Sequence, residues 1–120
     1  MNEKQALAAF SAMAQETRLR IVRMLVESGP EGLPAGAISE AVGATSSGAS
    51  FHLAQLERAG LIQSHRESRS IIYSASFDGL ANLIAFLMQD CCSGRAEVCG
   101  PAANVAATCL ASSQGAGCDC

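Results

Sequence analysis

Two short runs of helical periodicity separated by a very short connection constrain the fold more than any other feature of this chain. The first run covers residues 35–42 and ends at Gly43. Residues 44–47 (ATSS) offer several N-cap choices for the second run, which extends to Arg58 before Ala59 and Gly60. This spacing predicts a helix-turn-helix unit.

Further elements are predicted on both sides of this unit. Apolar residues repeat at helical spacing over residues 5–13 and 17–26, and the second run is closed by residues 28–30 (SGP). Residues 31–34 form a predicted loop. Two β-prone runs, residues 61–65 and 71–74, surround a polar tip and predict a hairpin, although no Asn-Gly type of turn fixes its register. A last helix is predicted over residues 77–89. The expected fold class is mainly α with a small β-hairpin.

Length and composition indicate one domain followed by a tail. The chain has 120 residues, of which 49% are hydrophobic and only 4% aromatic, so the core has to be built mainly from Leu, Ile, Val and Met. After Asp90 the sequence becomes small and polar. Because helix-turn-helix units are typical of DNA-binding proteins and an unburied apolar helix favours a dimer, we expect residues 1–92 to form a domain for DNA binding and dimerisation. Residues 93–120 are expected to form a partly flexible tail that contains cysteines.

The net charge of −3 neither suggests nor excludes DNA as a partner. From residue 77 onward the acids are Asp78, Asp90, Glu97 and Asp119, and the only base is Arg95. Residues 45–76 are mildly basic, so the acidity lies mostly outside the candidate reading region. A weakly positive surface can bind phosphates with modest, salt-dependent affinity.

The second helix of the helix-turn-helix unit is the candidate recognition helix, which would enter the major groove. Its periodicity places Ala49, Leu53 and Leu56 on an inward face. Serine hydroxyls near a helix start can bond phosphates, and Gln can pair with adenine edges. The alternative is a solvated polar face with serines as N-caps. The outward residues are Ser46, Ser47, Ser50, Phe51, His52 and Gln55.

Three runs of sequence resemble the ArsR/SmtB family of winged-helix metal sensors. Residues 50–62 (SFHLAQLERAGLI) resemble the family's recognition helix and wing entry. Residues 13–21 (MAQETRLRI) resemble the run that opens its second helix, and residues 66–73 (RESRSIIY) resemble its wing. Together the resemblance covers roughly residues 5–90 in the right order.

The resemblance implies a homodimeric winged-helix repressor. Such a repressor binds an inverted repeat in double-stranded operator DNA, leaves it when its ligand binds, and controls genes of metalloid efflux or detoxification. The implied DNA-binding residues are Ser47, Ser50, Phe51, His52 and Gln55 in the major groove, with Arg66 or Arg69 of the wing on the backbone or in the minor groove. A solvated tip for the two arginines and a packing role for His52 stay open, and His65 is expected to have no role.

Dimerisation is expected to use the apolar surface of the last helix together with the first helix. The predicted interface residues are Leu7, Phe10, Leu80, Leu83, Ile84 and Leu87.

Three cysteines form the candidate ligand site. Cys91 and Cys92 are adjacent and Cys99 follows after six residues, with no histidine nearby. An all-sulfur donor set selects thiophilic centres, and three thiolates satisfy As(III) or Sb(III) in a pyramid. Within the family, the cysteine pair of some arsenical repressors would fall in residues 33–42, which lack cysteine, and the His and carboxylate ligands of a zinc site are missing from the last helix. The cysteine cluster resembles that of arsenite-sensing members with cysteines at the end of the last helix.

Other uses of these thiols stay open. The same three sulfurs could bind Cd(II) or Pb(II), two of them could bind a methylated arsenical, and all could respond to oxidation. Burial as small hydrophobes is a further alternative. Cys118 and Cys120 at the very end are expected to belong to a dispensable tail, with a second thiol pair or a scavenging role as alternatives, and Cys109 has no assigned role.

The location and class of the protein follow from what the sequence lacks. The N-terminus has no secretory pattern and the apolar run near residues 80–88 is too short for a membrane span, so a cytoplasmic protein without membrane contact is expected. Six cysteines then indicate metal or redox chemistry rather than disulfides. The sequence contains neither a Cys-x-x-Cys motif within a βαβ pattern nor a phosphate-binding loop, so an enzyme is not expected. A metal-scavenging protein is the remaining alternative.

Overall fold

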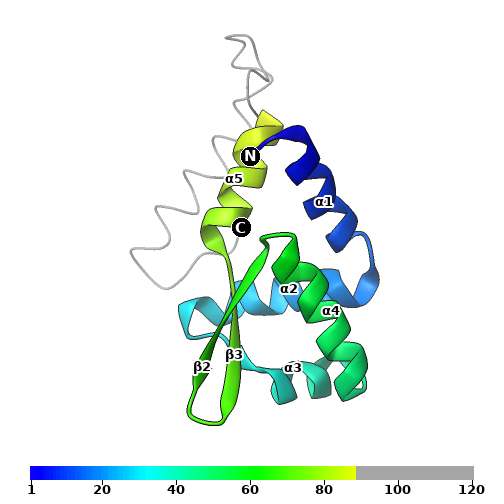
Figure 1. Ribbon diagram of the computed structural model, residues 1–120, viewed down its shortest axis with the longest axis vertical. Coiled ribbons are helices and arrows are strands. Elements are labelled where there is room, and N and C mark those ends of the chain that lie inside the picture. Colours follow the sequence, from blue (N-terminus) through cyan, green and yellow to red (C-terminus); the bar gives the residue numbers. More distant parts are fainter. Residues whose placement is uncertain (89–120) are drawn as a thin grey trace. The chain divides into compact units, whose positions relative to one another are not determined.

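The computed structural model describes residues 1–88, which contain five helices and three short strands (Figure 1). Contacts define a compact unit of Met1–Phe86, and a second unit starts at Leu87. In chain order the elements are α1 (Glu3–Met13), α2 (Glu16–Ser28), a 3-10 helix (Gly29–Glu31), β1 (Leu33–Pro34), α3 (Ala35–Val42), α4 (Ser46–Arg58), β2 (Ile62–Glu67), β3 (Ser70–Ala75) and α5 (Phe77–Met88).

Side-chain caps fix where the helices begin. The Asn2 side chain accepts a hydrogen bond from the Gln5 amide at 2.8 Å, and the Gln5 side chain accepts one from the Asn2 amide at 2.9 Å, so α1 starts with a capping box. Thr45 caps α4 because its hydroxyl accepts from the Gly48 amide at 3.0 Å. The predicted helix-turn-helix is confirmed as α3 and α4.

The end of α4 directs the chain into the hairpin. Gly60 has a φ of +80°, and its amide donates to the Glu57 carbonyl at 3.0 Å. The Leu61 amide donates to the Leu56 carbonyl at 3.1 Å. This pair of bonds is a Schellman motif, which uses glycine in the left-handed region to stop a helix.

The β-structure is a three-stranded antiparallel sheet of order β1-β3-β2, not only the predicted hairpin. The expected loop of residues 31–34 contains β1, in which Leu33 pairs with Tyr73 and Pro34 with Ile72. A two-residue strand is too short to show an alternating pattern. Its partner, β3, also lies far along the chain, so sequence analysis did not detect it. Gly32 permits the pairing: at a φ of +69°, an added Cβ would lie 2.2 Å from the Tyr73 carbonyl oxygen.

The core lies where α2, α3, α4 and the base of the hairpin meet. Its largest fully buried side chains are Ile21, Leu25, Ile38, Leu53, Leu56 and Leu61. Helix α1 packs on this core mainly through three alanines, Ala6, Ala9 and Ala12, while Leu7 and Phe10 are exposed. Small residues let two helices approach closely, so α1 lies tight against its neighbours without contributing bulk.

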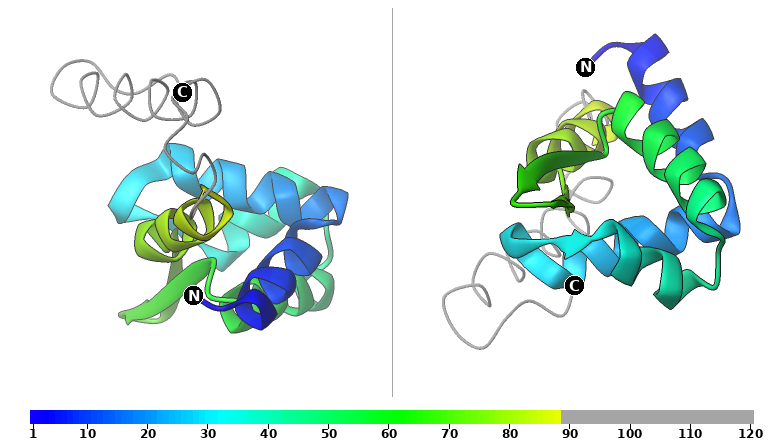
Figure 2. Two further views of the ribbon diagram at one scale, coloured as in Figure 1. Left: turned by 90° about the horizontal axis from the view of Figure 1, so that it is seen from above. Right: turned by 60° about the horizontal axis from the view of Figure 1, so that its bottom comes forward.

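Beyond this core, the hairpin formed by β2 and β3 projects from the helical part (Figure 2). Among the helices within residues 1–88, none has the length and apolar content that crossing a bilayer requires.

Candidate functional site

The outward face of α4 carries a row of exposed polar side chains at its N-terminal end. Ser46, Ser47 and Ser50 are exposed, and 58% of the Phe51 surface is accessible. The opposite face of α4 holds Ala49, Leu53 and Leu56, all buried, as the periodicity predicted. Three hydroxyls beside free helix N–H groups form a surface suited to phosphate oxygens and base edges.

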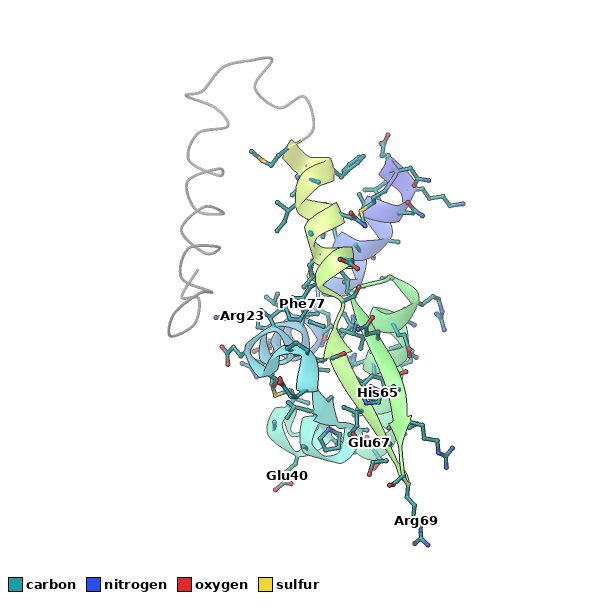
Figure 3. The ribbon with its side chains drawn as sticks, turned by 90° about the vertical axis from the view of Figure 1, so that its left-hand side faces the viewer. Arg23, Glu40, His65, Glu67, Arg69 and Phe77 are labelled. Carbon is teal, nitrogen blue, oxygen red and sulfur yellow. The ribbon has the colours of Figure 1, made fainter. Side chains whose placement is uncertain are left out.

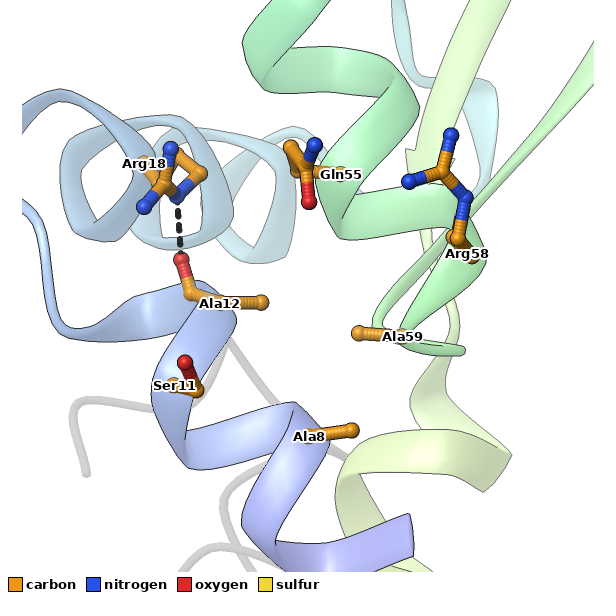
Figure 4. A pocket seen from close by; sticks show the side chains of 7 residues that line it. All are labelled: Ala8, Ser11, Ala12, Arg18, Gln55, Arg58 and Ala59. Carbon is orange, nitrogen blue, oxygen red and sulfur yellow. Dashed lines mark hydrogen bonds between the residues drawn. The ribbon is translucent and has the colours of Figure 1, made fainter.

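Two of the predicted DNA-binding residues are only half-exposed, because α1 and α2 cover their side of α4. Gln55 lines a cavity of about 240 Å³ between α1, α2 and α4 (Figure 4). Arg18 and Arg58 line the same cavity, and the small side chains of α1 leave it open. Gln55 is therefore placed between two cationic side chains.

His52 is the second half-exposed residue, and it is bonded to Arg18 of α2. The Arg18 Nη1 atom lies 3.2 Å from the His52 Nδ1 atom, while Arg18 Nε donates to the Ala12 carbonyl at 2.6 Å. The His52 ring also meets the Phe51 ring edge-on, with centroids 5.7 Å apart. Sequence reasoning missed the role of Arg18, because no local pattern links residues that lie 34 positions apart.

The hairpin presents an arginine at its tip. Glu67 pairs with Ser70, which leaves Ser68 and Arg69 as a two-residue turn. Ser68 adopts a φ of +56°, an uncommon conformation for a residue other than glycine. Figure 3 shows Arg69 extending from the tip. Arg66 is exposed as well, and its Nε atom donates to the Ser68 carbonyl at 3.4 Å.

A polar contact joins α4 to the hairpin. The Ser64 hydroxyl of β2 donates to Glu57 Oε2 of α4 at 2.7 Å. On the neighbouring strand, burial and secondarily the negative charge of Glu57 raise the pKa of the Tyr73 phenol above its usual 10.0. Glu57 thus ties the orientation of the hairpin to that of α4, which sequence reasoning also missed.

Apolar side chains remain exposed on α1 and α5. Exposed fractions are 62% for Leu7, 39% for Phe10, 61% for Ile84 and 55% for Leu87. Leu83 departs from the predicted interface: it is 4% exposed and belongs to the core, and Leu80 packs half-buried against that core. Of the predicted interface residues on α5, Leu83 thus lies in the core of its own chain, whereas Ile84 and Leu87 are exposed.

The predicted ligand residues Cys91, Cys92 and Cys99 lie outside the described residues, as do Cys109, Cys118 and Cys120. Within residues 1–88, no group of three or more His, Cys, Asp or Glu side chains could hold a metal ion.

The family whose description is "Helix-turn-helix domain" matches residues 13–65, the segment from the end of α1 into β2. A relative with a similar sequence is the HTH-type transcriptional regulator YgaV of Escherichia coli, 37% identical over 89 residues, which cover 74% of this chain and 88% of YgaV. The chain belongs to the ArsR-like winged helix-turn-helix transcriptional regulators.

Solved structures agree with this family. The homodimeric winged helix-turn-helix DNA-binding domain Mb0332 of Mycobacterium bovis superposes on this regulator with a TM-score of 0.60 at 27% identity, covering 71% of this chain and 76% of that one. A structure described as "Possible transcriptional regulator for arsenical resistance" gives a TM-score of 0.57 at 31% identity, covering 64% and 77%. The relatives are transcriptional regulators rather than enzymes, and α3, α4 and the wing form a DNA-binding domain.

Proposed function

We propose that this regulator is a dimeric repressor that binds an inverted repeat in operator DNA and leaves it when As(III) or Sb(III) binds its cysteines. The observation that supports DNA binding is the exposed face of α4. Ser46, Ser47 and Ser50 lie there, in the first turns of the helix that Thr45 caps. In a winged helix, such a face enters the major groove while the wing reaches the flanking backbone or minor groove. Arg69 at the wing tip supplies the cation for that contact.

Dimerisation is proposed through the exposed apolar side chains of α1 and α5. Leu7, Phe10 and Ile84 expose large apolar areas, which water disfavours. The homodimeric Mb0332 domain has the same fold. A two-fold dimer presents two copies of α4 to half-sites one DNA turn apart, so an inverted repeat is the matching operator.

The inducer is proposed from the donor set. Cys91, Cys92 and Cys99 offer three sulfurs and no nitrogen, and the rest of the domain holds no competing group of ligands within residues 1–88. Bound As(III) would supply three As–S bonds that draw these residues together. Thiols have to lose their protons to bind, so affinity should rise with pH.

The likeness to a regulator described for arsenical resistance supports this choice. Because Cys91 follows α5 in the sequence by three positions, a ligand there is well placed to act on α5 and hence on dimer geometry. A coupling free energy of about 1–3 kcal/mol, typical of allostery, would change DNA affinity roughly 5–150-fold.

The test is fluorescence anisotropy of the reduced protein on a labelled duplex, titrated in parallel with As(III), Sb(III), Cd(II), Zn(II) and an oxidant. The duplex is recovered by selection from a random-sequence pool, which does not require the operator to be known. Release by As(III) or Sb(III) alone, abolished in C91S and C92S and kept in C118S, supports the proposal. Release only by Cd(II) or by the oxidant would support a repressor but show that As(III) and Sb(III) are not its inducers. Failure to recover any duplex would contradict the proposed binding to operator DNA.

A further inference from the structure

Arg18 occupies an unusual place, at the N-terminal end of α2 with its side chain turned toward two other helices. The start of a helix disfavours a cation, because the helix dipole is positive there. In the same turn, Glu16 satisfies that preference and pairs with Arg20 on the surface at 2.6 Å. Arg18 is half-buried, so local helix energetics do not explain its position.

The first contact of Arg18 is with the end of α1. Helix α1 has no basic residue in its last turn, and the Ala12 carbonyl is one of the groups that its helical ladder leaves unpaired. Arg18 Nε donates to this carbonyl at 2.6 Å (Figure 4). A guanidinium from α2 thereby caps α1 from outside.

The second contact of Arg18 is with His52 of α4, and it bears on which nitrogen of the imidazole ring acts as the acceptor. A guanidinium has five N–H donors, no acceptor, and does not lose its proton in proteins. The short distance of 3.2 Å from Nη1 to Nδ1 is therefore a hydrogen bond only if Nδ1 of His52 carries no proton. The neutral ring then bears its proton on Nε2.

We propose that Arg18 is a positioning residue for DNA recognition: it joins α1 to α4 and holds His52 as the neutral Nε2–H tautomer. The proposal rests on the proposed role of α4 as the recognition helix. One planar guanidinium fixes the distance from the Ala12 carbonyl to the His52 ring, and through it the rotation of α4 about its axis. The edge-on contact of the His52 ring with the Phe51 ring would also restrict the position of Phe51 on the exposed face of α4.

The tautomer is tested first, without DNA. Long-range ¹H–¹⁵N correlation spectra of the folded protein, recorded above the range in which imidazole titrates, distinguish Nδ1–H from Nε2–H. The chain has two histidines, and the H65Q variant assigns the His52 signals by elimination. We expect the Nε2–H pattern for His52 and a shift toward mixed tautomers in R18Q. A predominantly Nδ1–H ring, or a spectrum that R18Q leaves unchanged, overturns the proposal whether or not the protein proves to be a repressor.

The effect on DNA is tested with a matched control, because the removal of any arginine weakens phosphate binding. Arg20 lies two residues away on the same helix and is exposed, so R20Q makes the same change in charge. On the duplex recovered by selection, we expect R18Q to reduce affinity by about tenfold or more, the size typical of a bond to a charged group. R20Q should reduce it far less, and both variants should weaken similarly on a random duplex. Equal reductions on the selected duplex contradict a positioning role.

Two further variants separate positioning from folding. H52N places a carbonyl oxygen near the position of Nδ1 and should keep much of the affinity, whereas H52A should resemble R18Q. In the double variant R18Q/H52A the two effects should not add, since both changes break the same hydrogen bond. If R18Q does not fold, R18K keeps the charge but not the two-pronged geometry, and it should show the same reduction in selective binding. Additive effects, or an R18K protein with wild-type affinity, overturn the proposal.

Discussion

The side chains proposed to contact DNA have very different surroundings. Ser46, Ser47 and Ser50 are exposed on the first turns of α4, while His52 is enclosed by Arg18 and Phe51. The serines are therefore suited to direct contacts, and in the proposal above His52 orients the helix that carries them. Arg69 lies in the two-residue turn at the tip of the hairpin, where its long side chain can reach a phosphate or a minor groove.

We expect Arg69 to contact a phosphate, so its replacement by alanine should weaken binding to every duplex by a similar factor, because phosphate contacts carry no sequence information. The dependence of log K on log salt should become shallower by about one unit for each phosphate that the variant no longer neutralises. Anisotropy titrations at several salt concentrations measure this slope. R23A is the matched control, since Arg23 lies on a different surface (Figure 3). An equal change of slope in R23A would argue against a wing contact.

The Tyr73 phenol makes the stability of the folded protein depend on pH. Burial and then Glu57 raise the pKa of the folded phenol above 10.0, so at high pH the unfolded chain releases this proton first. The unfolded state then binds fewer protons, and stability falls as pH rises through and above 10. Urea denaturation at about pH 9 and about pH 11, on either side of this range, should show a smaller fall in stability for Y73F than for wild type. Identical falls would mean that Tyr73 ionises equally in both states.

Among the secondary-structure elements, one close approach determines how α5 leaves the sheet. Gly79 lies against the turn between α4 and β2, and an added Cβ would stand 2.1 Å from the Gly60 carbonyl oxygen. Because the contact is between two backbone segments, no flexible side chain could move aside to make room for an added Cβ. The start of α5 is thus fixed directly against the Schellman turn that ends α4.

Gly79→Ala should destabilise the domain by about 1–3 kcal/mol, the range usual for overpacking, and more if α5 detaches. Gly36→Ala in α3 is the matched control, since nothing lies within 4 Å of an added Cβ there. Alanine has a higher helix propensity than glycine, so G36A, in the first turn of α3, should leave stability unchanged or raise it by up to about 1 kcal/mol. Denaturant unfolding gives both values. Changes of the same sign and size in the free energy of unfolding of G79A and G36A would contradict the close contact between Gly79 and Gly60.

For the molecule as a whole, the proposed function depends on a partner copy. The side of α5 that carries Leu83 is buried in the core, while Ile84 is 61% exposed. Helix α1 divides in the same way, with Ala6 and Ala9 inside and Leu7 outside. These two helices therefore have one face for the monomer and one for the proposed dimer.

Ile84→Glu should leave the monomer folded and shift the dimer toward monomer, because it places a charge on the proposed interface only. Sedimentation equilibrium measures the association, and anisotropy on an inverted repeat should show weaker binding than for wild type, with half-site binding retained. V26E on α2 is the control, since Val26 is also exposed and apolar. A stable dimer of I84E would place the interface elsewhere.

The order and type of the main elements could be predicted from the sequence, because their signals are local. Glycine at positions 43 and 60, Thr45 as a cap and apolar spacing over residues 46–58 act within one or two helical turns. The inward face of α4 follows from the same periodicity. Exposure of the serines and of Arg69 was predictable for this reason, although their contacts with DNA stay predictions.

Features that join distant residues emerged from the folded structure instead. Strand β1 exists because β3 pairs with it, and the contact of Arg18 with His52 spans 34 positions. Leu83 and Ile84 are neighbours with similar hydropathic character, yet the packing of α5 buries one and exposes the other. A sequence pattern shows that a helix has an apolar face, but the width of that face assigned to the core depends on which elements surround the helix.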